Sequence, residues 1–268
     1  ESVTSTTGYL EGGRIRVGGE FQGADVGLRE ASYTTVEERA SLSADGLNGD
    51  AGSIIVWANR DTLFAGDVSA SALGSNGNGG LIEVTGKESH GLGGTFAATS
   101  VGGTAGTVLF DPGTITVGNF ATPGVNVINI SLINNTLQNG SSVILATSGA
   151  GSNVVFNDVD LGDGQTAGGA VQNGTVHSAL AFDDRIHPRY LAIQWTNSDA
   201  SFAVFAGGNI FVDNHIRTSG AGSISLVAGW SGTEADFQVG GIFDGAASTV
   251  DVGLADNSNP VKLSSFNS

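Results

Sequence analysis

The amino-acid sequence predicts an all-β fold: a parallel β-solenoid, in which the chain winds through stacked coils, with loop excursions and one short helix. Glycine makes up 43 of the 268 residues, well above the usual ~7%. A glycine-led strand also recurs, starting at Gly13, Gly52, Gly80 and Gly106, so the spacings are 39, 28 and 26 residues. Such a recurrence is typical of stacked coils. A β-sandwich would need hairpins and would not show it.

The four strands share one alternating pattern, which predicts a column of buried side chains. Alternate side chains of a strand point to opposite faces. The inward column is predicted to contain Ile54, Val56, Ile82, Val84, Val108 and Phe110, preceded by Ile15 and Val17. The outward set is predicted to contain Arg14, Arg16, Ser53, Glu83 and Thr107. On this register, Ile82→Ala would cost ~2 to 5 kcal/mol, and Glu83→Ala less than about 0.5 kcal/mol.

The rest of each unit also repeats. Aligning residues 53–80 with 81–106 places Phe64 on Leu92, Val68 on Phe96 and Ala70 on Ala98. Three inward segments per unit predict three faces per coil. Roughly 8 to 10 coils in the chain, each rising ~4.8 Å, would make a rod on the order of 40 to 50 Å long. The longer first spacing predicts an excursion near 28–40, where charged residues are dense.

One continuous solenoid domain is predicted, in three stretches. Residues 1–118 form regular coils with the excursion, 119–190 less regular coils with long turns rich in Gly, Asn and Asp, and 191–268 regular coils again. Within the middle stretch, 131–140 predicts a short helix with Ser131 as N-cap and Gly140 as its end.

Charge and composition exclude several partners. Lys and Arg number 10 against 26 Asp and Glu, a net charge of −16. Binding to nucleic acid requires a basic surface, and an anionic membrane would repel this chain. No apolar run approaches the ~18 residues of a spanning helix, so no membrane insertion is expected. The absence of cysteine excludes disulfides and thiolate chemistry. The chain opens without Met or a signal peptide, so we expect an excised or mature piece.

Several runs resemble a known family. GSIIVWANRDTLFAGDVSA, NGNGGLIEVTGK and AGTVLFDPGTITV are similar to the region that follows the secretion domain in filamentous haemagglutinin-like exoproteins of bacterial two-partner secretion, as is ASFAVFAGGNIFVDNHIRTSGAGSISLVAGW. The resemblance spans most of 49–230; Trp57, the EVTGK turn at 83–87 and the sequence FDP at 110–112 occur in the same order. It implies a right-handed parallel β-helix, export through an outer-membrane transporter pore, and adhesion or biofilm work on the surface of a Gram-negative bacterium. No catalytic residue or cofactor carries over.

An enzyme is the alternative, because polysaccharide lyases and hydrolases also use β-helices. The candidate cluster is Asp183, Asp184, His187 and Arg189, since paired carboxylates can serve glycoside hydrolysis. Neighbouring residues of a strand point to opposite sides, and Pro188 indicates a turn, which favours a solvated loop. His90, His177 and His215 stand alone in the sequence and are predicted to lie in turns or on outer faces.

Other candidate sites are weaker. Asp158, Asp160 and Asp163 offer oxygen ligands for Ca²⁺ without the spacing of a known calcium motif, so no metal site is assigned. Asn129, Asn134, Asn139 and Asn173 each begin a glycosylation sequon. Outward aromatic residues such as Trp57 and Trp230 could stack on sugars or cover a neighbouring loop.

The main functional hypothesis is a structural shaft segment of a secreted adhesin or matrix fibre, with the cell surface or glycans as partners. A module that binds glycans or a host protein through the loop 28–40 is a further alternative. Neither end reads as a polar cap, so we expect each end to meet more coils of a longer parent or a second copy stacked head to tail.

Overall fold

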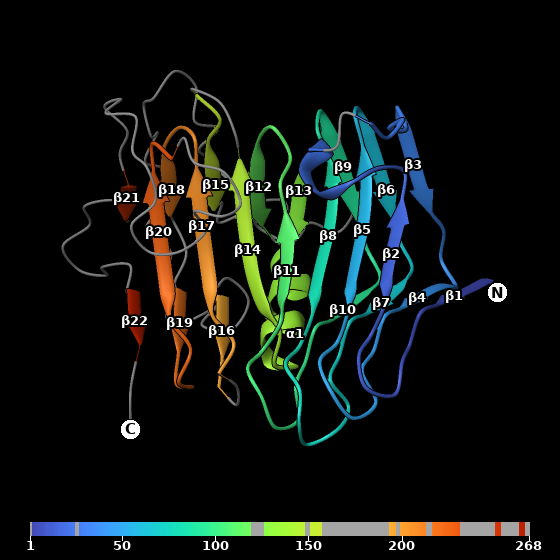
Figure 1. The fold of residues 1–268 in the computed structure, drawn as a ribbon. Coiled ribbons are helices and arrows are strands. Elements are labelled where there is room, and N and C mark those ends of the chain that lie inside the picture. The colour runs from blue at the N-terminus through green and yellow to red at the C-terminus, as the bar shows by residue number, and fades with distance from the viewer. Residues whose placement is uncertain are drawn as a thin grey trace.

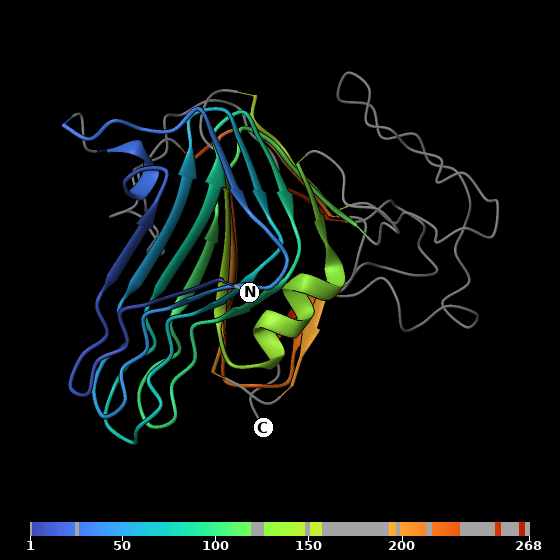
Figure 2. The same ribbon diagram turned by 90° about the vertical axis from the view of Figure 1, so that its right-hand side faces the viewer.

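The fold is a three-sided parallel β-helix (Figure 1). The computed structural model describes residues 2–24, 27–118, 126–147, 151–156, 193–196, 199–212 and 216–230, and the backbone of two further strands at 250–252 and 263–265. Viewed from the N-terminal end, the chain rises on one face, descends on the next and returns along the third, turning clockwise as it recedes (Figure 2). That path is right-handed. Every strand pair in the three faces is parallel, as predicted for a β-helix.

The first sheet contains the glycine-led strands. Its seven members pair in chain order: β2 (Arg14–Val17), β5 (Ser53–Ala58), β8 (Leu81–Gly86), β11 (Thr107–Phe110), β14 (Ser142–Thr147), β17 (Phe202–Ala206) and β20 (Ile224–Ala228). One strand per coil gives seven coils along the described strands of this sheet. The later coils are spaced more widely in the sequence: β14 and β17 pair although they lie far apart in the chain.

The second sheet has one strand more than the first. Its spatial order is β3 (Tyr33–Val36), β6 (Asp61–Phe64), β9 (Ser89–Leu92), β13 (Val127–Asn129), β12 (Ile115–Gly118), β15 (Val154–Phe156), β18 (Ile210–Val212) and β21 (Val250–Val252). After β12 the chain steps back, and β13 pairs with both β9 and β12. This insertion accounts for the less regular pattern that the sequence shows after residue 118.

The third face changes from sheet to helix and back to sheet. Its first strands are β1 (Ser2–Ser5), β4 (Ala40–Ser43), β7 (Asp67–Ser69) and β10 (Thr95–Ala97). Its last strands are β16 (Ile193–Trp195), β19 (Ile216–Thr218) and β22 (Leu263–Ser265). Between them, α1 (Ile130–Gln138) packs against β10 and β16 (Figure 1).

The helix is where the sequence predicts one, but its N-cap is different. Asn129 is the N-cap, and its Oδ1 accepts from the backbone N–H of Ser131 at 2.9 Å. Ser131 instead lies in the first turn, where its hydroxyl also donates to Asn129. Gly140 has φ of 93°, the left-handed conformation that ends many helices. Ile133 and Leu137 project from one side of α1 into the core.

The core follows the alternating pattern of the strands. Ile54, Val56, Ile82, Val84, Val108 and Phe110 are fully buried in the first sheet. Ile54 pairs with Ile82, which in turn pairs with Val108. The aligned Phe64 and Leu92 are likewise neighbours in the second sheet, as are Val68 and Phe96 on the third face.

Polar side chains form ladders along the outside of the coils. Asp50 Oδ1 accepts from the backbone N–H of Asn78 at 2.7 Å, and Asn78 Oδ1 accepts from the backbone N–H of Thr104 at 3.0 Å. The Ser89 hydroxyl donates to Asp61 Oδ1, likewise between neighbouring coils. Each ladder fixes the register of neighbouring coils, because a slip of one residue would break every bond in it.

The excursion of the first coil lies earlier than predicted. Within the expected range 28–40, Tyr33–Val36 is strand β3 and Ala40 begins β4, with only a short turn between them. The chain instead leaves the coil over the described residues 18–24 and 27–32, which we call the excursion. The charged residues Glu37, Glu38 and Arg39 were predicted to belong to the excursion. They instead form this tight turn between β3 and β4, in which Arg39 has φ of 72°.

Candidate binding surface

The excursion begins and ends at the same corner of the first coil. The backbone N–H of Ala31 donates to the carbonyl of Gly18 at 2.6 Å and closes the loop. Gly18 has φ of 84°, and a Cβ there would lie 2.1 Å from the Trp57 carbonyl oxygen. Only glycine fits at this departure point.

The excursion folds over the outer face of the first sheet and buries it. A 3₁₀ turn, η1 (Phe21–Gly23), lies above Trp57, whose side chain is only 4% exposed. A Cβ at Gly19 would lie 2.5 Å from the Trp57 ring, so this glycine allows the loop to pack directly on the indole. Trp57 is therefore not available to stack on a sugar. Trp230, at 3% exposure, is also buried.

Glu83 lies under the excursion, which corrects its predicted exposure. Its side chain does point outward from the sheet, yet it is 0% exposed. The backbone N–H of Gln22 donates to both carboxylate oxygens, at 3.2 and 3.1 Å. The predicted exposure of Glu83 was wrong, because the excursion that covers this residue comes from 61 positions away in the sequence.

We expect Glu83→Ala to destabilise the protein by ~1 to 3 kcal/mol, since it leaves a buried N–H group without its acceptor. The free energy of unfolding, measured by chemical denaturation, tests this. Glu88→Ala is the matched control, because that carboxylate is 58% exposed and pairs with Arg60 on the surface. Equal effects of the two substitutions would contradict the buried role of Glu83.

A cluster of charges anchors the start of the excursion to the first strand. Glu20, 8% exposed, pairs with Arg14 and Arg16 of β2. Its pKa is lowered, chiefly because the backbone N–H of Phe21 donates to the carboxylate; Arg16 and Arg14 act in the same direction, and burial opposes them. This contribution to stability is present above the ordinary carboxylate pKa and is lost as the pH falls through the lowered one.

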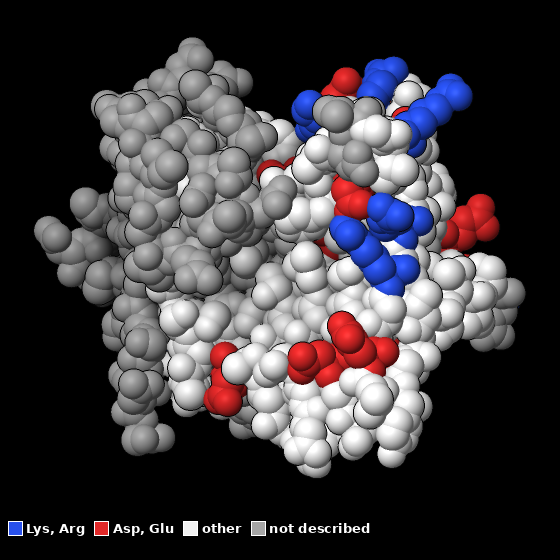
Figure 3. Space-filling model, in the orientation of Figure 1, with Lys and Arg blue, Asp and Glu red and all other residues white. Residues whose placement is uncertain are grey.

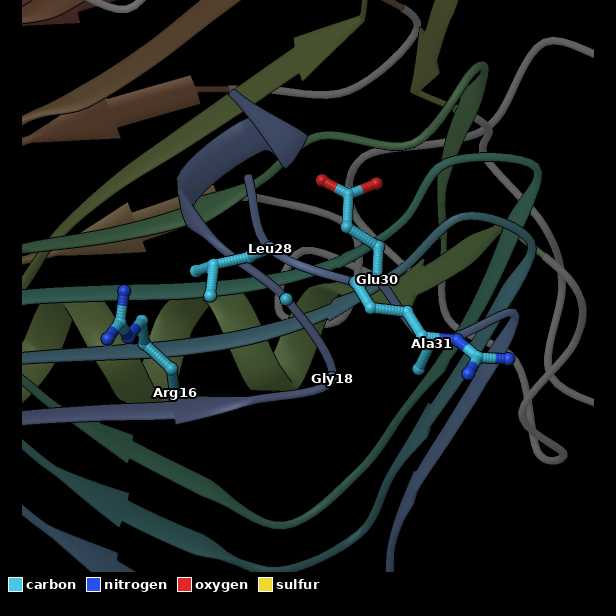
Figure 4. A pocket seen from close by; sticks show the side chains of 7 residues that line it. Arg16, Gly18, Leu28, Glu30 and Ala31 are labelled. Atoms are coloured by element: carbon cyan, nitrogen blue, oxygen red, sulfur yellow. The ribbon is translucent and has the colours of Figure 1, made fainter. Parts of the chain in front are cut away.

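A pocket of about 360 Å³ opens between the excursion and β2. Figure 4 shows Arg16 and Leu28 toward one end of it and Glu30 and Ala31 toward the other. Gly18, Gly19 and Arg29 complete the lining. Glu30 Oε1 is buried and has no hydrogen-bond partner among the described residues. A polar ligand could supply that partner, because buried polar atoms are normally hydrogen-bonded.

Two basic side chains, Arg16 and Arg29, line this pocket. Figure 3 shows Lys and Arg concentrated over the N-terminal coils. Seven Lys and Arg residues lie in the described ranges, and six of them belong to the first three coils: Arg14, Arg16, Arg29, Arg39, Arg60 and Lys87. Arg60 is bound to Glu88 and stacks over the Tyr33 ring, with its Cζ 5.2 Å from the ring centroid. The same coils contain eleven described Asp and Glu residues, so any attraction for an acidic ligand would be local to the arginines of the pocket.

His90 lies inside the coil, not in a turn or on an outer face as predicted. It continues a corner column in which Thr34 pairs with Thr62 and Thr62 with His90. The two threonine hydroxyls donate to the carbonyls of Trp57 and Thr85. His90 is 1% exposed, and neither ring nitrogen has a hydrogen-bond partner within the described ranges. Burial lowers its pKa to about 3, so the imidazole is neutral.

The candidate catalytic and calcium residues lie outside the described residues. These are Asp183, Asp184, His187, Arg189, Asp158, Asp160 and Asp163, together with His177, His215 and Asn173. Within the described ranges, no group of three acidic or histidine side chains could hold a metal ion. None of the helices described there is long and apolar enough to cross a membrane.

Three of the predicted glycosylation sites lie around α1. The Asn129 side chain caps the helix, and Asn134 Oδ1 accepts from the backbone N–H of Gln194 at 2.9 Å. Asn139 is exposed at the end of the helix, although Ser141 of its sequon is fully buried. Asn139 is therefore the most accessible of the three amides.

The buried outer layer of the first sheet leaves a signal in the sequence. Ile54 and Ile55 are adjacent and fully buried, as are Val108 and Leu109. Consecutive apolar residues are typical of strands covered on both faces. Ile55 is also in register with Glu83, which is in register with Leu109. An apolar row on the outer face could thus have indicated that something covers Glu83.

Comparison with known proteins adds no assignment. No protein-family model matches the chain, and no curated protein matches it.

Proposed function

We propose that this chain is a shaft segment of a secreted bacterial surface adhesin or extracellular matrix fibre, which acts in attachment or biofilm. The observation that carries the proposal is the continuous stack of seven coils, joined by parallel strands and held in register by outer polar ladders. Such a stack gives length and stiffness, since each coil supports its neighbours. The sequence resemblance to filamentous haemagglutinin-like exoproteins supports the same role.

The proposed partners follow from that role. They are an outer-membrane transporter pore during export and a cell surface or its glycans afterwards. End-to-end stacking into a homopolymer is also proposed. Such stacking would continue the parallel pairing of the coils from one copy to the next, because strand edges recruit further strands.

Attachment can be tested with beads coated with the chain. We expect coated beads to remain on bacterial biofilm matrix or on epithelial cells under flow better than albumin-coated beads. Retention no better than that of the albumin control would contradict an adhesive role. Electron microscopy of the same preparation would reveal filaments if the copies stack end to end.

A glycan-binding module is the second candidate, and the pocket beside Arg16 favours it. The pocket combines the basic Arg16 and Arg29, the apolar Leu28 and the buried Glu30 Oε1, which has no partner among the described residues. This combination suits a small acidic sugar. Binding of sialylated or uronic oligosaccharides that is lost in Arg29→Ala would support it. Cleavage of acidic polysaccharides by the chain would instead support the alternative of a polysaccharide lyase or hydrolase.

A further inference from the structure

A row of exposed apolar side chains runs along the turns between the third face and the first sheet. Gly8, Gly46, Ala72 and Ser100 form successive parallel bridges, one in each of the first four coils. The residue after each bridge is apolar. We call this row the turn ridge: Tyr9, Leu47, Leu73 and Val101, with Leu10 beside Tyr9.

The ridge is regular and open to solvent. Its exposed fractions are 69% for Tyr9, 47% for Leu47, 51% for Leu73 and 70% for Val101. The backbone N–H groups of Leu47, Leu73 and Val101 each donate to the carbonyl of the bridge residue in the preceding coil. The ridge side chains therefore repeat with the rise of the coil. Figure 2 shows these turns stacked at the lower left, projecting from the body of the helix. A continuous apolar stripe of this kind marks an interaction surface.

Charges lie at only one end of the ridge. Its turns span 8–12, 46–50, 72–78 and 100–104, and they contain two charged residues, Glu11 and Asp50. Both belong to the first two turns. The third and fourth turns consist of Gly, Ala, Ser, Thr, Asn, Leu and Val.

We propose that the turn ridge is a self-association surface on which two copies of the chain pair side by side and antiparallel. A repeat of ~4.8 Å is matched by a second ridge with the same repeat. The antiparallel order places Tyr9 against Val101 of the second copy and Leu47 against Leu73. It also places Glu11 and Asp50 opposite uncharged turns of the second copy. A parallel order would instead place each of these acidic residues opposite the same residue of the second copy. A pair of this kind has two-fold symmetry and closes.

Sedimentation of the full chain over a range of concentrations tests the pairing. We expect a monomer–dimer equilibrium that salt strengthens, because salt screens the repulsion between two chains of charge −16. Leu47→Asp, in the middle of the ridge, should abolish the dimer. Leu63→Asp is the matched control: Leu63 is 53% exposed on the second sheet, and its replacement should leave the dimer intact.

Cross-linking tests the antiparallel order, since the chain has no cysteine of its own. Oxidation of a mixture of Y9C and V101C chains, one of them carrying a mass tag, should give a cross-linked heterodimer. Y9C alone should not cross-link to itself, because three coils, or about 14 Å, would separate the two thiols, beyond the reach of a disulfide.

Three results would overturn the proposal: a monomer at every concentration, a Y9C homodimer, or equal loss of the dimer in L47D and L63D. A monomer that sediments with phosphatidylcholine vesicles would assign the ridge to lipid instead. Failure of bead attachment leaves the ridge untouched, because the dimer involves neither the open ends nor an adhesive target. End-to-end stacking is distinguishable as well, since it gives an open series of sizes that L47D would not remove.

Discussion

Replacing Phe110 by alanine is expected to lower the free energy of unfolding by ~3 to 5 kcal/mol. Phe110 is fully buried, and its ring centroid lies 5.2 Å from the ring centroid of Phe96 in an edge-to-face arrangement. Phe96 in turn lies 5.2 Å from Phe64. The substitution therefore opens a cavity and ends an aromatic stack that joins all three faces of the helix. Chemical denaturation of the two proteins measures the loss.

Two controls separate packing from other effects. Phe110→Leu keeps most of the volume and should cost less than about 1.5 kcal/mol. Leu63→Ala removes an exposed side chain and should change stability by less than about 0.5 kcal/mol. If Phe110→Ala cost no more than Leu63→Ala, the inward register of the first sheet would be wrong.

His90 is expected to make the protein lose stability in acid. Its pKa is lowered from 6.5 to about 3 by burial, so the folded state binds fewer protons than the unfolded state between these values. The free energy of unfolding must then fall as the pH decreases from about 6.5 toward 3, by up to ~1.4 kcal/mol per pH unit. Well above pH 6.5 the imidazole is neutral in both states and adds no pH dependence.

The matched variant is His90→Leu, because neither imidazole nitrogen has a partner to lose among the described residues. We expect this variant to be at least as stable as the parent near pH 7. The difference between the two stability profiles should widen steadily below pH 6.5, since acidic groups such as Glu20 contribute equally to both. Parallel profiles from pH 7.5 to 4 would show that His90 titrates normally.

The repeat determined most of the fold in advance. Alternation within each glycine-led strand was enough to place Ile54, Ile82 and Val108 in one buried column, because side chains of a strand alternate between two faces only. Three inward segments within each repeating unit were enough to predict three faces per coil. His90 could have been placed as well, since it lies two residues before the inward Leu92 and aligns with Thr62.

The binding surface was less predictable because it joins segments that are distant in the sequence. Glu83 reads as an outward polar residue, and only the excursion that folds over it makes it a buried acceptor for Gln22. The turn ridge shows the opposite case. Its apolar residues follow glycine or small residues in turns of different lengths, and their stacking becomes visible only once the bridges align the coils.

The sequence by itself thus determined the coil, its three faces, its inward column and the short helix, because these depend on local periodicity and on neighbouring repeats. Tertiary structure alone decided what covers the outer face of the first sheet, where β13 enters the second sheet, and which turn residues stack. Those features depend on contacts between segments that are distant in the sequence and do not share a repeating pattern. A pattern of alternation says which way a side chain points, but burial also depends on what lies beyond it.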